Sequence, residues 1–127
     1  MYTDVKISYN TVGKVVRLMP DVLTVLLGNY REAITEIFGE KLSRIVLFGS
    51  YARGDFNQNS DMDIMILVDV QPEEISHYAD LVYDITYDFE EKYEIEINPC
   101  VQSVKTYDQW KKAYPFFINI ERDGVTV

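Results

Sequence analysis

The stretch from Leu47 to Ile64 constrains this chain more than any other. An apolar run ends in the dipeptide Gly49-Ser50, and after ten intervening residues the acids Asp61 and Asp63 open a second apolar run. Glycine lets backbone approach a ligand closely, and serine offers a hydroxyl and a backbone N–H to phosphate oxygens. On a strand, residues two apart point to the same face. Two neighbouring carboxylates are typical ligands of Mg²⁺, which completes its shell with water and substrate phosphates.

Each part of this stretch has an ordinary structural explanation when it is taken alone. A Gly-Ser pair is commonly a turn, and an Asp-x-Asp pair is commonly a solvated strand face. The conjunction is more specific, because residues 64–68 continue from the acids as an apolar strand of the buried type. Two like charges at the start of a buried strand cost free energy unless a cation offsets them. The pattern therefore favours a cation site beside a phosphate-binding turn.

The segment from Gly49 to Asp63 resembles the signature of the DNA polymerase β-type nucleotidyltransferase superfamily, which is Gly-Ser, ten residues, then Asp-x-Asp. The short chain and the continuation Ala52-Arg53-Gly54 are similar to those of the minimal nucleotidyltransferases. These are stand-alone prokaryotic domains that often act as antitoxins to HEPN toxins. The resemblance covers roughly residues 30–125, and it is specific at the motif and loose elsewhere.

The resemblance implies a Mg²⁺-dependent transfer of AMP from ATP to a hydroxyl acceptor, which would be a tyrosine of a helical HEPN-type toxin. Asp61 and Asp63 would bind two Mg²⁺ ions. Ser50 and the Gly49 backbone would hold the β- and γ-phosphates. Adenylylation of the toxin would silence it, so the chain would act as an antitoxin.

A two-metal site normally needs a third carboxylate from a neighbouring strand. A strand expected over 94–101 places Glu96 centrally, on one face with Glu94 and Asn98. Related proteins usually carry an aspartate where this chain has Glu96. A shift of about one ångström in a reacting group can cost about a hundredfold in rate, so the longer side chain bears on catalysis more than on metal binding. The alternative is that Glu94 and Glu96 form a solvent-exposed strand face.

Two further side chains near the motif are candidates for phosphate binding. Arg53 is one, because a guanidinium engages phosphate oxygens bidentately; alternatively it pairs with Asp55 or Asp61. Ser60 either caps the turn into the second strand or binds phosphate. No Gly-Lys-Ser/Thr loop follows the glycines, and a single histidine and a single cysteine give little support to zinc binding or to Ser-His-Asp chemistry.

Composition limits the partners and the location. With 127 residues, the chain is expected to form one domain over 1–127, with its core over about 30–125. A net charge of −9 argues against direct nucleic-acid binding, which needs Lys and Arg at the phosphates. The first 20 residues lack the apolar core of a signal peptide, and no run reaches the roughly 18 apolar residues of a membrane span. A cytoplasmic protein is expected.

Apolar periodicity predicts an α+β fold, and the resemblance makes it polymerase β-like: a small mixed β-sheet with helices mainly on one face. The aromatic residues near the C-terminus, Trp110, Tyr114, Phe116 and Phe117, are expected in the core. The expected elements are a short helix over 12–19, a main helix over 29–38 with a break near Gly28, strands over 44–48, 61–68 and 94–101, a long helix after Pro72, and helices over 106–112 and 116–121.

Two other functions fit the same residues. A domain of this size has little surface with which to enclose both a nucleotide and an acceptor. It could instead be a binding module that neutralises its partner by contact alone. It could also be a nucleotidyltransferase for small molecules such as antibiotics. Those enzymes usually carry an additional helical domain, which is not visible in this chain.

Overall fold

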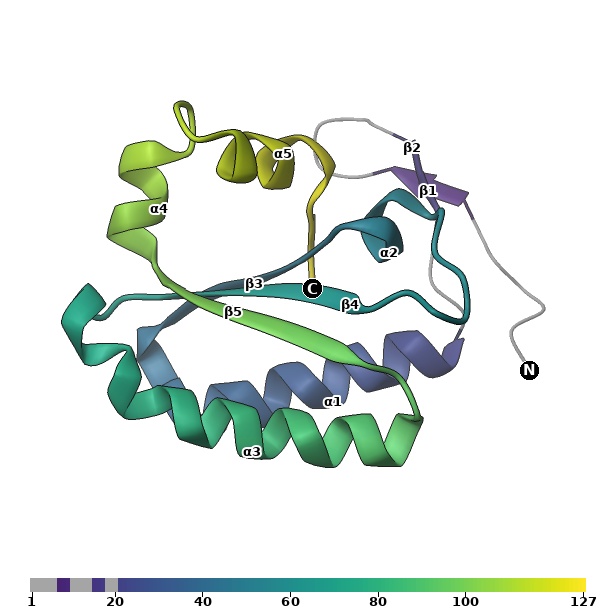
Figure 1. Cartoon of the computed structure of the whole chain (residues 1–127), viewed down its shortest axis with the longest axis horizontal. Coiled ribbons are helices and arrows are strands. Elements are labelled where there is room, and N and C mark those ends of the chain that lie inside the picture. Colours follow the sequence, from purple (N-terminus) through teal and green to yellow (C-terminus); the bar gives the residue numbers. More distant parts are fainter. Residues whose placement is uncertain (1–6, 10–14, 18–20) are drawn as a thin grey trace.

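The computed structural model describes residues 7–9, 15–17 and 21–127, and it shows a mixed four-stranded sheet packed on two long helices (Figure 1). The strands lie in the order β5-β4-β3-β6; β3 is antiparallel to β4 and β6, and β4 is parallel to β5. Their bounds are β3 Leu42–Phe48, β4 Met62–Val68, β5 Ile97–Ser103 and β6 Val125–Thr126. A separate antiparallel pair is formed by β1 (Ile7–Tyr9) and β2 (Val15–Arg17).

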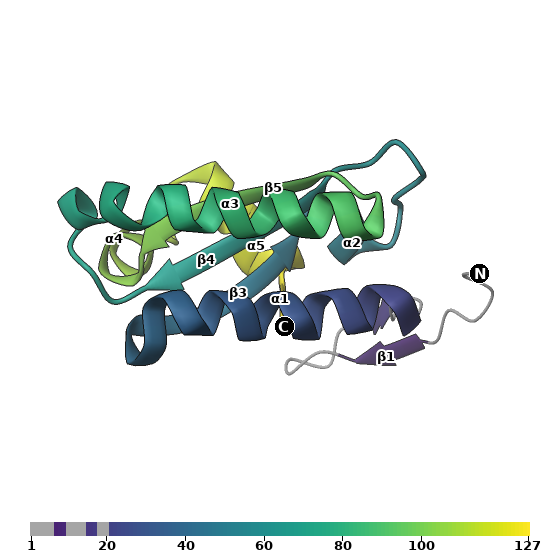
Figure 2. The ribbon, with the colours of Figure 1, turned by 90° about the horizontal axis from the view of Figure 1, so that it is seen from below.

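The two long helices, α1 (Asp21–Phe38) and α3 (Ser76–Tyr93), lie side by side on one face of the sheet (Figure 2). A short 3-10 turn follows α1 over Gly39–Lys41, and another precedes α3 over Pro72–Glu74. The apolar residues of α1 recur every three or four positions and are buried: Leu23, Leu26, Leu27, Tyr30, Ile34 and Phe38. The Tyr30 hydroxyl shares a 2.7 Å hydrogen bond with Thr86 Oγ1 of α3, which joins the two helices inside the core.

The main helix is longer than the sequence predicts, because it runs through Gly28 without a break. Gly28 is exposed, and a Cβ added there would meet no atom within 4 Å. A helical glycine costs about 1 kcal/mol relative to alanine. The buried apolar face on both sides of it outweighs that cost. The helix ends where it was expected to end, before Gly39 with its positive φ of 57°.

Strand β4 is apolar on both faces because helices cover both faces of the sheet. Met62, Ile64, Ile66 and Val68 belong to the core shared with α1 and α3. Met65 and Leu67 belong to a second cluster, formed with the short helices α4 (Val104–Trp110) and α5 (Pro115–Asp123). The prediction of a small mixed sheet with helices mainly on one face is confirmed, and α4 and α5 add a partial cover on the other. By alternation, Asp63 shares the face of Met65 and Leu67.

Two strands begin later than predicted. β4 starts at Met62 and β5 at Ile97, so Asp61 and Glu96 each lie just before a strand, and the expected central place of Glu96 in its strand is wrong. β5 begins late because α3 continues to Tyr93. The helix then ends at Glu94, which adopts a left-handed conformation with φ 56°. The chain then has only two residues left before it joins the sheet.

The remaining expectations have mixed outcomes. The short helix expected over 12–19 is wrong at residues 15–17, which are β2, and its other residues lie outside the described part. Of the four aromatic residues expected in the core, Phe117 is buried, and Trp110, Tyr114 and Phe116 are exposed. Among the described residues, no helix is both long and apolar enough to cross a membrane.

Candidate functional site

The Gly-Ser pair forms a sharp turn between a strand and a helix. β3 ends at Phe48, and the four-residue helix α2 (Ser50–Arg53) begins at once. Gly49 has φ 71° and ψ −154°, a conformation that side-chain-bearing residues rarely adopt. The backbone N–H groups of Ala52 and Arg53 both donate to the Gly49 carbonyl at 3.1 Å. A helical turn therefore follows the glycine directly, with Ser50 at its start.

The same glycine lies against one of the two acids. In the β3–β4 register, Phe48 is the partner of Asp63, so Gly49 follows directly beside it. A Cβ added to Gly49 would overlap Oδ2 of Asp63. Only a residue without a side chain leaves room for this carboxylate. The two halves of the motif, eleven residues or more apart in the chain, thus meet in space.

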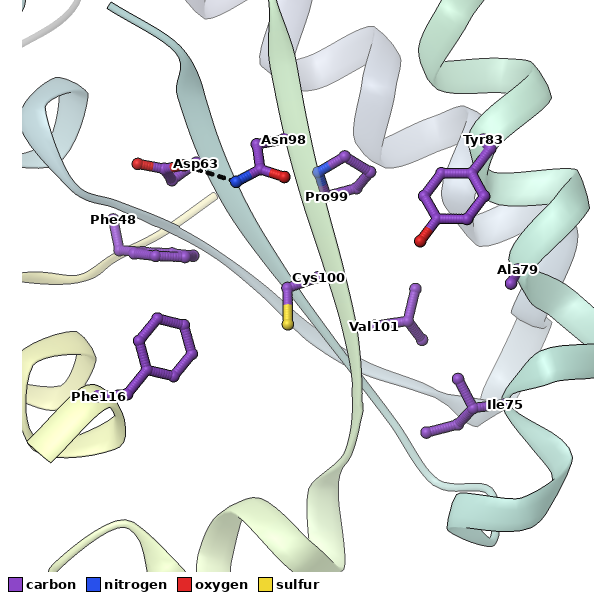
Figure 3. A pocket seen from close by; sticks show the side chains of 10 residues that line it. All are labelled: Phe48, Asp63, Ile75, Ala79, Tyr83, Asn98, Pro99, Cys100, Val101 and Phe116. Carbon is purple, nitrogen blue, oxygen red and sulfur yellow. Dashed lines mark hydrogen bonds between the residues drawn. The ribbon is translucent and has the colours of Figure 1, made fainter. Parts of the chain in front are cut away.

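On its other side Asp63 meets Asn98, a residue that the sequence places on one face with Glu96 but to which no motif assigns a role. β4 and β5 are parallel, and their register pairs Asp63 with Asn98. Asn98 Nδ2 donates a 3.2 Å hydrogen bond to Asp63 Oδ1 (Figure 3). Asp63 is half-buried and Asn98 is exposed. The signal that would have found Asn98 is this inter-strand register.

Asp61 has a different neighbour. The Met62 N–H donates to the Glu96 carbonyl at 2.8 Å, which brings the residues before the two strands together. The pKa of Glu96 is raised, mainly by a side-chain hydrogen bond with Asp61, then by the charge of Asp61, with smaller contributions from desolvation and from the charge of Glu90. Two carboxyl groups in such contact favour sharing a proton or a cation. Glu96 therefore lies beside the acidic motif, as expected, and its contact is with Asp61.

The three acids do not form one cluster. Asp61 contacts Glu96, and Asp63 contacts the amide of Asn98. Among the described residues, no group of three His, Cys, Asp or Glu side chains is placed to hold a metal ion. Mg²⁺ does not require such a group, because it is usually bound by one or two carboxylates together with water and substrate phosphates. The donors of Asp61, Asp63 and Glu96 are all hard oxygens. This donor set fits Mg²⁺ that is shared with a phosphate ligand.

Two hollows open beside these pairs. The larger, of about 540 Å³, contains Asp63 and Asn98 and has aromatic walls that include Phe48, Tyr83 and Phe116 (Figure 3). The Phe48 and Phe116 rings meet edge to face with centroids 5.6 Å apart. The smaller hollow, of about 280 Å³, is polar, and its lining residues are Tyr51, Gln58, Asn59, Ser60, Asp61, Glu94, Ile95 and Glu96. The two aspartates of the motif therefore border different spaces.

The two additional candidates make local contacts. Arg53 Nε donates to Asp55 Oδ2 at 3.3 Å, and both side chains are largely exposed, which is the alternative foreseen for Arg53. Ser60 Oγ accepts a 2.9 Å hydrogen bond from the Asn57 N–H, so this hydroxyl caps the turn before β4. Ser60 also borders the smaller hollow. Phosphate binding by Arg53 and Ser60 stays a prediction.

Comparisons with known proteins found a matching family and similar proteins. Residues 27–124 match the family model described as "Nucleotidyltransferase domain". A protein of Methanocaldococcus jannaschii named "Putative protein adenylyltransferase MJ0141" is 33% identical over 104 residues, which are 80% of this chain and 95% of that protein. A second protein of that organism, "Putative protein adenylyltransferase MJ0604", is 34% identical over 92 residues, or 72% of this chain and 84% of the other.

Among solved structures, similar chains occur in toxin–antitoxin complexes. One is the complex of a tri-AMPylated Shewanella oneidensis HEPN toxin with MNT antitoxin; the match has a TM-score of 0.49 and 13% identity, and it covers 81% of this chain and 69% of that one. Another is a toxin–antitoxin with AMP-PNP, with a TM-score of 0.49, 18% identity, and coverage of 77% and 69%.

Proposed function

Because the chain belongs to the nucleotidyltransferase domain family, we propose that it transfers AMP from ATP to a hydroxyl group of a protein, with Mg²⁺. The observation that carries the proposal is the contact between Gly49 and Asp63. It brings the half of the motif that we expect to bind phosphate to the half that we expect to bind a cation. The names of the two relatives, which describe protein adenylyltransferases, support a protein as the acceptor.

Asp61 and Asp63 would hold two Mg²⁺ ions, and Glu96, which contacts Asp61, would add the third carboxylate. When bound, the ions supply positive charge that stabilises the attacking and leaving oxygens of an in-line displacement. Ser50 and the Gly49 backbone would bind the β- and γ-phosphates of ATP. Arg53 and Ser60 would add phosphate contacts, and Arg53 would exchange its exposed ion pair with Asp55 for them.

The reaction forms one bond and breaks another. The acceptor oxygen attacks the α-phosphorus of ATP, the bond from that phosphorus to the bridging oxygen of the β-phosphate breaks, and pyrophosphate leaves. The acceptor's hydroxyl proton must go to a base. Glu96 is the candidate base, because its carboxylate lies beside Asp61 at the site where the acceptor would react.

The partner that follows from the sequence resemblance is a helical HEPN-type toxin, and the acceptor is one of its tyrosines. The net charge of −9 suits a partner with a basic surface, such as a protein that itself acts on RNA. AMP on the toxin would block it, and this chain would be the antitoxin. Direct contact of this chain with nucleic acid is not part of the proposal.

The test is incubation with α-labelled ATP and Mg²⁺, alone and with the product of the neighbouring gene, followed by autoradiography and intact mass. We expect one or more AMP groups on the partner, and none with Asp61→Asn combined with Asp63→Asn. Asp69→Asn, an exposed residue just after the far end of β4, is the control and should transfer normally. A tight complex without transfer would contradict the proposal and favour neutralisation by contact. The absence of both transfer and a complex would also contradict the proposal. The search would then turn to small-molecule acceptors.

A further inference from the structure

The side chain opposite Asp63 on the neighbouring strand is a neutral amide. Asn98 occupies the paired position in the parallel β4–β5 register, and its Nδ2 donates to Asp63 Oδ1 at 3.2 Å. Gly49 leaves room for the other oxygen, Oδ2. The carboxylate is therefore oriented from two sides, by an amide on β5 and by a missing side chain after β3.

The contrast with the neighbouring pair concerns charge. Before the same two strands, Asp61 contacts a second carboxyl group, that of Glu96. Beside Asp63, the equivalent place is taken by Asn98, which carries no charge. The affinity of an oxygen site for a divalent cation is tuned by the number of charged ligands and by the rigidity of the site. The Asp63 side therefore has a carboxylate held by a hydrogen bond and a single negative charge.

We propose that Asn98 is a positioning residue for Asp63, and that its neutral amide limits the affinity of this part of the site for divalent cations. The inference rests on the proposed function, because it takes Asp63 to be a cation ligand. Asn98 acts through its hydrogen bond to Oδ1, which fixes the orientation of the carboxylate, as partners of metal-binding carboxylates commonly do. A carboxylate at position 98 would have nearly the same shape and would add one negative charge beside Asp63.

The strand itself offers a matched control. Gln102 lies four residues after Asn98 on β5, so it faces the same side of the sheet, and it also ends in an amide. Its register partner is Leu67, remote from both acids of the motif. Asn98→Asp and Gln102→Glu change the net charge of the protein equally, and only the first places the new charge beside Asp63.

The first measurement is the dissociation constant of Mn²⁺, used as the probe itself and followed by electron paramagnetic resonance. Asn98→Asp should bind Mn²⁺ about tenfold more tightly than the wild type, because a charged ligand joins Asp63. Asn98→Ala should bind it roughly tenfold more weakly, because the carboxylate loses its orienting hydrogen bond. Gln102→Glu should stay close to the wild type. Equal affinity of Asn98→Asp and the wild type, or equal gains for Asn98→Asp and Gln102→Glu, would overturn the proposal.

The second measurement is the melting temperature with a chelator and with Mn²⁺, which separates a positioning role from a purely structural one. Without a cation, Asn98→Asp should melt below the wild type, because two like charges lie side by side. Saturating Mn²⁺ should raise its melting temperature by more than it raises that of the wild type. A loss of stability that is the same with and without Mn²⁺ would contradict the proposal.

Asp63→Asn separates the failure of this inference from that of the proposed function. If Mn²⁺ binds Asp63→Asn as tightly as the wild type, the assignment of Asp63 as a cation ligand fails, and the role of Asn98 fails with it. If Asp63→Asn weakens binding and Asn98→Asp does not strengthen it, the proposed function stands and the inference about Asn98 alone is wrong.

Discussion

Two pairs of side chains lie where β4 and β5 begin, and they are built differently. Asp61 and Glu96 are exposed residues that precede their strands, and both are acids. Asp63 and Asn98 lie within the strands, in register, and only one of them is charged. The first pair supplies charge with little backbone constraint, and the second supplies fixed geometry with little charge. A site that combines the two pairs has the charge to bind a divalent cation and also holds one carboxylate in a defined orientation.

The difference follows from how the sheet begins. Residues inside paired strands have their side-chain positions set by the ladder, whereas residues before a strand are set by the loop that leads into it. The loop before β5 is short because α3 ends in the left-handed Glu94. It brings Glu96 to Asp61 through one backbone hydrogen bond, from the Met62 N–H to the Glu96 carbonyl.

The largest expected effect comes from removing the two aspartates one at a time. Asp63→Asn should lower the rate of AMP transfer by ~10³-fold or more, since several kcal/mol of transition-state stabilisation depend on the bound ions. Asp61→Asn should cost less, about 10- to 100-fold, because Glu96 remains beside it as a second carboxylate. Single-turnover rates with labelled ATP measure both. A larger loss of rate for Asp61→Asn than for Asp63→Asn would contradict the different roles given to the two pairs.

A methyl group at Gly49 tests the close contact that orients Asp63. Gly49→Ala should destabilise the fold by about 1–3 kcal/mol, because alanine is strained at this φ and its Cβ would overlap the Asp63 carboxylate. Transfer should fall about a hundredfold, as expected for a misplaced ligand. Gly28→Ala, at an open position of α1, is the control and should stabilise by about 0.5–1 kcal/mol. Urea unfolding measures the free energy of unfolding of both variants. A value for Gly49→Ala equal to that of the wild type would refute the steric argument.

Arg53 tests whether a side-chain cation, in addition to metal, serves the acidic site. Arg53→Ala should raise the KM for ATP about tenfold, the effect of losing one charged phosphate contact. It should leave the melting temperature nearly unchanged, because the pair with Asp55 is largely exposed and such pairs contribute about 0–1 kcal/mol. Arg53→Lys is the matched variant, and its KM for ATP should lie between those of the wild type and Arg53→Ala. An unchanged KM for Arg53→Ala would leave Arg53 as a surface residue only.

The smallest effect is the pH dependence of the acidic pair. Because the folded-state pKa of Glu96 is raised, the folded protein binds this proton more tightly than the unfolded chain. The corresponding stability is present at pH values below the unfolded pKa of about 4.5 and is lost as the pH rises through the folded value.

Glu96→Gln removes that titration. With a chelator at pH 7 its melting temperature should be slightly above that of the wild type, and this advantage should vanish near pH 4. Glu73→Gln, exposed in the 3-10 turn before α3, should show no such pH-dependent advantage. A melting temperature of Glu96→Gln that is lower than the wild type at pH 7 would mean that the Asp61–Glu96 contact is attractive without a cation.

Local sequence was enough to predict the turn of the site but not the pairing across its strands. Gly49, Ser50 and the helical turn after them follow from residue types within a few positions. The register that puts Asn98 opposite Asp63 joins segments 35 residues apart, so no local pattern reports it. The start of β5 escapes prediction for a related reason: the alternation of Glu94, Ile95 and Glu96 is typical of a strand, while the long α3 helix leaves those residues as a loop.

The central claim is that the Gly-Ser turn and the acids before and within β4 bind one metal–nucleotide unit. A crystal structure with Mn²⁺ and a non-hydrolysable ATP analogue, with the anomalous scattering of manganese recorded, tests it most directly. The account predicts manganese bound to Asp61 and Asp63, and phosphate oxygens at the Gly49 backbone and the Ser50 hydroxyl. Nucleotide bound elsewhere, or manganese that leaves both aspartates without contact, would contradict it.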